Sequence, residues 1–126
     1  MPGVSASRLV VVTIDWIRKH CLQLPHVTED VKWENNLVFS VANKMFALVS
    51  LEPREIWLSL KCPPEEFVEL VEWPLCRQAP YFARGHWVAF ESPDALSARE
   101  WERLLTQAYN LVFAKLPKKT QRELAE

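Results

Sequence analysis

The chain has 126 residues, of which 49% are hydrophobic and 25% are charged, and this is the composition of a soluble globular protein. Its net charge of −1 and isoelectric point near 6.3 exclude a strong overall field that would draw it to nucleic acid or to an anionic membrane. No stretch approaches the roughly 20 apolar residues of a membrane-spanning helix, and three cysteines without a C-x-x-C pair indicate reduced thiols. We therefore expect a cytoplasmic protein with one domain over residues 1–126.

The first predicted element is a helix that begins after Thr13. The Thr13 hydroxyl can cap the helix, and apolar residues then recur every three or four positions, at Ile14, Ile17, Cys21 and Leu24. Pro25 disfavours helical geometry in the residue before it, so the helix should end near Leu22. Upstream, residues 9–12 are compatible with either an extension of this helix or a strand, because valine is β-branched.

Four strands joined by tight turns are predicted next. The first holds Val31 and Trp33 and ends at the Asn35-Asn36 turn, since asparagine tolerates left-handed geometry. A second strand follows, and a turn at Ala42-Asn43 leads into a third strand over 44–50. A turn at 52–54 precedes the fourth strand. The residues expected on the inner face are Leu37, Phe39 and Val41 in the second strand and Ile56, Leu58 and Leu60 in the fourth.

Three helices and one strand complete the pattern. Pro63-Pro64-Glu65-Glu66 opens a short helix, because proline suits a first turn and acids favour its positive end. Residues 75–84 are the least regular segment, and 86–90 form another strand. Ser97 and Glu100 make a capping box before a long amphipathic helix that Pro117 ends, and 118–126 form a last short helix. The inward-facing residues are Phe67, Leu70 and Val71, then Trp101, Leu104, Leu105, Ala108 and Val112, and finally Leu124.

This order of elements predicts the fold class α+β, arranged as a two-layer sandwich. An antiparallel β-meander with one apolar face needs cover on that face. The N-terminal and C-terminal helices should therefore pack across it, on one side only.

Seven motifs occur along the chain in a characteristic order. They are Leu24-Pro25-His26-Val27, Trp33, Lys44-Met45-Phe46-Ala47, Leu58-Ser59-Leu60-Lys61, Tyr81, His86-Trp87-Val88 and Tyr109-Asn110-Leu111-Val112. Over about residues 13–124 the chain resembles the MmcQ/YjbR family of small bacterial domains, and this resemblance implies a domain core with the same bounds. The chain departs from the family pattern at Ala108, where serine is usual, and after Phe90, where Ser92-Pro93-Asp94 replaces a glycine turn. The resemblance implies a frataxin-like, double-wing fold and a DNA-binding role.

No motif in the sequence indicates catalysis, so we expect a non-enzymatic protein without cofactor or metal. There is no glycine-rich phosphate loop, no G-x-S-x-G and no H-E-x-x-H. His20 and Cys21 are adjacent, but neighbours on a helix diverge by about 100°, so they do not form a nucleophile–base pair. The acids of the short helix, Glu65, Glu66, Glu69 and Glu72, are explained by the helix dipole, although a frataxin-like fold invites an iron-binding reading.

Basic residues are the candidates for weak, sequence-nonspecific DNA binding through phosphate contacts. The candidate set is Lys44, Lys61, Arg84, Lys115, Lys118, Lys119 and Arg122, and residues 115–122 form its densest stretch. No row of arginine or asparagine at helical spacing suits base reading. The ordinary alternative is that these cations lie near a helix C-terminus or solvate strand ends.

A groove is the second candidate site, and it would make the protein a binding module for another protein or a small anionic ligand. Trp57, Tyr81 and His86, with Trp73, could line it beneath the irregular segment 75–84. Strand alternation puts His86 and Trp87 on opposite faces of the sheet. The ordinary alternative is that Trp87 packs under the long helix while His86 satisfies a backbone carbonyl.

Overall fold

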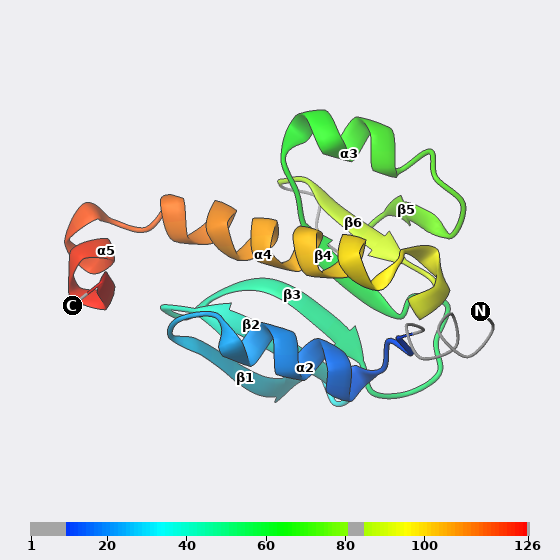
Figure 1. Ribbon diagram of the computed structural model, residues 1–126, viewed down its shortest axis with the longest axis horizontal. Coiled ribbons are helices and arrows are strands. Elements are labelled where there is room, and N and C mark those ends of the chain that lie inside the picture. Colours follow the sequence, from blue (N-terminus) through cyan, green and yellow to red (C-terminus); the bar gives the residue numbers. More distant parts are fainter. Residues whose placement is uncertain (1–9, 81–84, 126) are drawn as a thin grey trace, which may run out of the picture.

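The computed structural model describes residues 10–80 and 85–125, and in this part of the chain six strands form one antiparallel sheet with helices on one face (Figure 1). The sheet order is β1-β2-β3-β4-β6-β5. The strands are β1 (Val27–Lys32), β2 (Asn36–Val41), β3 (Lys44–Ser50), β4 (Leu58–Lys61), β5 (Cys76–Gln78) and β6 (Trp87–Phe90). The helices are α2 (Ile14–Gln23), α3 (Pro64–Leu70), α4 (Ala98–Ala114) and α5 (Lys118–Ala125), with a 3-10 turn at Pro93–Ala95. The predicted α+β two-layer sandwich is confirmed.

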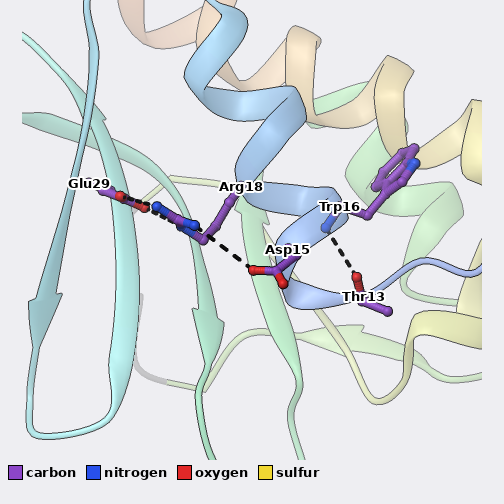
Figure 2. Close-up of polar contacts among 5 residues, drawn as sticks. All are labelled: Thr13, Asp15, Trp16, Arg18 and Glu29. Atoms are coloured by element: carbon purple, nitrogen blue, oxygen red, sulfur yellow. Dashed lines mark hydrogen bonds and ion pairs between the residues drawn. The ribbon is translucent and has the colours of Figure 1, made fainter.

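Helix α2 begins where the sequence predicts and is tied to the edge strand β1. The Thr13 hydroxyl accepts a hydrogen bond from the Trp16 N–H at 3.1 Å, which caps the first turn (Figure 2). Arg18 donates from Nε and Nη2 to the two carboxylate oxygens of Glu29 at 2.8 and 2.6 Å, a two-pronged ion pair between α2 and β1. Residues 10–13 form neither a helical turn nor a strand. For residues 10–12, the predicted helix extension and the predicted strand are therefore both wrong.

The hairpin between β2 and β3 confirms the predicted turn and strand limits. Ala42 and Asn43 have φ of 50° and 65°, the left-handed pair that a two-residue hairpin requires. A register shift between Phe39 and Ser40 leaves Phe46 as an extra residue on β3, so that Phe46 and Ala47 both join the core beneath the helices. Leu37, Phe39 and Val41 share that face, as expected.

Two residues assigned to strands by sequence lie elsewhere. Trp33 follows β1 in a turn at φ 50°, and its side chain is 60% exposed. Ile56 precedes β4 and packs with Trp87 on the opposite side of the sheet from Leu58 and Leu60. Both predictions assumed uninterrupted alternation, and both fail because the chain leaves the extended conformation beside a turn.

The face of the sheet opposite the helices, called here the open face, is also partly buried. Trp87, Ala79 and Ala89 form a small apolar cluster there, with Met45, Leu48 and Ile56 packed against it. The ordinary alternative placed Trp87 under the long helix, and this prediction is wrong because Trp87 lies on the open face. Within the predicted irregular segment 75–84, the described residues 76–78 form the edge strand β5 beside β6.

Helix α4 carries the main cover of the sheet. Ser97 and Glu100 form the predicted capping box, and Trp101 is fully buried, with its ring edge-on to Trp57 and Phe90. At the other end of α4, the Tyr109 hydroxyl donates to the Pro25 carbonyl at 2.8 Å and so links this helix to the end of α2. The predicted inward residues of α4 are all buried.

Candidate functional site

Six of the predicted basic residues gather at one end of the molecule, called here the basic end. Lys44 begins β3, and Lys61 ends the antiparallel neighbour β4, so the two lie at the same end of the sheet. Lys115 ends α4, and α5 extends beyond it at the left of Figure 1. The basic end consists of Lys44, Lys61, Lys115, Lys118, Lys119 and Arg122.

None of these six cations makes an ion pair within residues 10–80 and 85–125. By contrast, four arginines outside this set each have a carboxylate within 4 Å: Arg18, Arg54, Arg77 and Arg103. Six acidic residues thus lie beside arginines elsewhere, whereas no described carboxylate lies within 4 Å of the six cations of the basic end, although α5 also carries Glu123. A net charge of −1 for the chain therefore conceals a segregated distribution.

Lys61 and Lys115 are close enough to influence each other. Partial burial lowers the pKa of Lys61, and the positive charge of Lys115 lowers it further. The Lys61 side chain extends over Gly85, whose φ is +77°, and a Cβ at that glycine would stand 3.7 Å from Lys61 Cε. Holding two like charges together is unfavourable in the free protein, and a bound anion would relieve it.

Helix α5 is held in place by three contacts. Gln121 Nε2 donates to the carbonyls of Ala114 and Leu116 at 3.2 and 2.8 Å, where α4 ends. Leu124 packs against the core, as predicted, and its carbonyl accepts from His26 Nε2 at 2.5 Å. These contacts fix the helix while its basic side chains, Lys118, Lys119 and Arg122, remain exposed.

The ordinary explanation of the basic residues fits only part of the set. Lys115 lies at the C-terminal end of α4, where the helix dipole favours a cation. Lys118 and Lys119 instead occupy the first turn of α5, the positive end of its dipole, and no acidic residue accompanies them there. Their position costs stability, typically about 0.3–1 kcal/mol each, so helix stability does not explain it.

Two of the predicted groove residues, His86 and Trp57, do not come together. His86 faces α3, where its ring lies edge-on to Phe67 with centroids 5.1 Å apart. Trp57 instead lies against Trp101 at one end of the sheet. Tyr81 and Arg84 lie outside the described residues. The structure therefore separates His86 from Trp57.

Trp57 lines a different cavity that sequence reasoning missed. A groove of about 880 Å³, called here the open-face groove, crosses the sheet on the side away from the helices. Its walls include Trp33, Leu48, Arg54, Trp57, Ser59 and Arg77. Ser59 of β4 and its cross-strand partner Leu48 of β3 both line it. The sequence does not specify which residues of neighbouring strands lie opposite each other, so it could not reveal this groove.

The described residues offer little for catalysis or metal binding. They contain no group of three or more histidine, cysteine or acidic side chains that could hold a metal ion. All three cysteines are free and buried, and burial raises the pKa of each thiol, to about 12 for Cys62 and about 11 for Cys76. No described helix is long and apolar enough to cross a membrane.

Comparisons with known proteins agree with this fold. A family model described as YjbR matches residues 22–111. The crystal structure of the Deinococcus radiodurans protein DR2400, with a DUF419 domain, is similar at 30% identity and a TM-score of 0.80, over 90% of this chain and 88% of that one. A Pseudomonas syringae protein has the same fold at 21% identity and a TM-score of 0.67, over 79% and 98% of the two chains. Among curated proteins, none matches.

Proposed function

The chain belongs to the YjbR family, and from that premise we propose that it is a small, non-enzymatic, cytoplasmic protein that binds nucleic acid weakly and without sequence preference. The phosphate backbone would contact the basic end. Arg84, outside the described residues, remains a predicted member of this surface. The three free cysteines support a reducing compartment, and the absence of any catalytic motif in the sequence supports a binding role.

The placement of Lys118 and Lys119 is the observation that carries this proposal. Both lie at the positive end of α5 without an ion pair in the described chain, beside Lys115, which itself perturbs Lys61. Residues that do not stabilise their own helix, and that add to a local excess of positive charge, are best explained by an anionic partner. Phosphate at the start of α5 would be attracted by the lysines and by the helix dipole together.

The expected affinity and specificity follow from the number and kind of contacts. Six phosphate contacts on duplex DNA give a slope of about −5 for the logarithm of the binding constant against the logarithm of salt concentration. Nonspecific binding of this type has dissociation constants on the order of 10⁻⁶ to 10⁻⁴ M at physiological salt. Lysines make up most of the surface, and they contact phosphate as point charges rather than reading bases.

The test is fluorescence anisotropy of labelled duplex and single-stranded DNA, titrated with the protein between 50 and 200 mM salt. Replacing both α5 lysines by glutamate (K118E/K119E) should weaken binding and make the salt slope shallower by about 2. The matched control is K19E/K32E, which changes the net charge equally at two exposed lysines outside the basic end.

Two results would contradict the proposal. One is the absence of binding to either DNA at 50 mM salt. The other is an equal loss of affinity in K118E/K119E and K19E/K32E, because the effect would then come from net charge and not from the basic end.

A further inference from the structure

The open-face groove adjoins the basic end at one point and extends away from it. Ser59 lines the groove, and Lys61 of the basic end lies two residues further along β4 on the same face, about 7 Å away. At its other end the groove reaches Ser50, the last residue of β3, about 20 Å from Lys44 at the start of that strand. The α5 residues of the basic end, Lys118 and Lys119, do not line the groove, so variants of α5 separate the two sites.

We infer that the open-face groove binds a small planar aromatic molecule that carries an anionic group. The cavity volume of about 880 Å³ is in the range of pockets that hold small molecules. Trp33 and Trp57 line it together with the apolar Leu48 and Ile56, and the Trp33 side chain is 60% exposed, whereas the Trp57 ring also lies against Trp101 on the helix side. The exposed indole of Trp33 suits a flat ring, because it offers a large apolar face at a low entropic cost.

Ser59 supplies a polar contact inside the groove. The residue is only 4% exposed, its side chain is on the open face, and it lines the cavity. Its hydroxyl makes no hydrogen bond within the described part of the chain. Ser50, the neighbouring hydroxyl, is different because it already donates to the Glu52 carbonyl at 2.7 Å. Among the described residues, the buried side-chain oxygens without a partner are those of Glu66 and Gln107, so the Ser59 hydroxyl is accessible from the groove and can bond to a ligand there.

Arg54 supplies the hydrogen-bond donors for an anionic group. Arg54 and Arg77 line the groove with Glu55, and the carboxylates of Glu52 and Glu91 also lie within 4 Å of these two arginines. Arg77 is already engaged, donating to Glu55 at 2.7 Å and to Glu91 at 2.5 Å. Arg54 lies 3.8 Å from Glu52, beyond hydrogen-bond distance, and makes no hydrogen bond in the described chain. Its guanidinium is thus available to a carboxylate or phosphate group on the ligand.

Trp57 gives the groove one rigid wall. Its backbone N–H donates to the Phe90 carbonyl at 2.8 Å, and its own carbonyl accepts from the Ser50 N–H at 2.7 Å. Its ring is held edge-on against the fully buried Trp101 at 5.5 Å. A wall fixed in this way is preorganised, so that binding orders little on that side.

The experiment compares two aromatic anions with their uncharged counterparts by two-dimensional NMR of the labelled protein. The probes are indole-3-acetate and adenosine 5′-monophosphate, and the counterparts are indole and adenosine. Both anions should shift the amide signals of Leu48 and Ser59 and the indole N–H signals of Trp33 and Trp57. The neutral compounds should bind about fivefold more weakly, as expected for one half-exposed charge contact.

Variants distinguish this site from the alternatives. Arg54→Gln should remove the difference between anions and neutral compounds, and Ser59→Ala should weaken all four probes. Trp33→Ala, at an exposed side chain that the core does not need, should weaken them as well. K118E/K119E is the matched control, and probe binding there should equal that of the wild type even if nucleic-acid binding is lost.

Three results would overturn the inference. They are the absence of shifts in the groove with millimolar probe, shifts confined to residues 115–122, and equal binding of charged and neutral probes. A failure of nucleic-acid binding with intact probe binding would overturn only the proposed function.

Discussion

The attachment of α5 through Gln121 can be tested by one substitution. Gln121→Ala removes two hydrogen bonds, to the carbonyls of Ala114 and Leu116. Each bond contributes about 0.5–1 kcal/mol net at such a partly exposed site, so docking of α5 should lose about 1–2 kcal/mol. This corresponds to an undocked population that rises about 5- to 30-fold. Because an eight-residue helix is not stable alone, undocking means unfolding of α5.

Trypsin provides the assay, since it cleaves after lysine and arginine and α5 contains Lys118, Lys119 and Arg122. When closing is fast, the cleavage rate follows the undocked population and should rise by the same factor. Mass spectrometry would identify the fragments, and the midpoint of thermal unfolding should change little. Gln23→Ala is the control, because Gln23 is exposed at the end of α2 and makes no side-chain hydrogen bond in the described chain. Cleavage of the Gln121 variant at the wild-type rate would refute this account of how α5 is held.

Three further predictions concern the core and the titrating groups. Tyr109→Phe keeps the ring but leaves the Pro25 carbonyl without its 2.8 Å hydrogen bond, so urea unfolding should show a loss of about 1 kcal/mol, and no loss would contradict the role of that bond. Burial lowers the pKa of His20, so the folded state binds its proton less readily than the unfolded chain, and stability should fall as the pH drops below 6.5. His20→Gln should flatten that decline between pH 7 and 5, and an unchanged slope would exclude His20 as its source. Because the thiol pKa is raised to about 12 at Cys62 and about 11 at Cys76, a thiol reagent at pH 8 should react with them only as urea unfolds the protein; rapid labelling without urea would show that they are accessible.

The sequence predicts the parts of this fold that depend on residues close together in the chain. Thr13 caps α2 and Ser97 caps α4, because a cap needs only its own first turn. Strand β3 has the predicted limits because Ala42 and Asn43 form the hairpin turn in front of it.

Features that depend on packing between distant segments were not predictable in this way. Trp33 takes a left-handed conformation that its residue type disfavours, so no local rule places the turn there. Alternation alone allows either assignment of faces to His86 and Trp87. The contact of His86 with Phe67 of α3, and that of Trp87 with Ala79, decide between them. The open-face groove likewise depends on the pairing between β3 and β4, which brings Leu48 beside Ser59.

The basic end was predictable from the sequence only in part. Sequence reasoning found its members from their charge, and the density of residues 115–122 indicated the surface. It did not find that Lys115 lowers the pKa of Lys61, because that proximity follows from the position of α4 across the sheet. Nor could it show that the acidic residues pair elsewhere, with the arginines.

The order of elements along the chain also constrains how the protein folds during its synthesis. Strands β1–β4 come from residues 27–61 and pair with their neighbours in sequence, so their contacts are local and can form early. Their cover comes mainly from α4, which begins at residue 98. A nascent chain that has made only the meander would therefore present Phe39, Phe46 and Val49 to water, the kind of surface that promotes association between unfinished chains. Chaperone capture or rapid completion of the last third of the chain would protect this intermediate, and mRNA features that slow translation between β4 and α4 should lower the yield of folded protein.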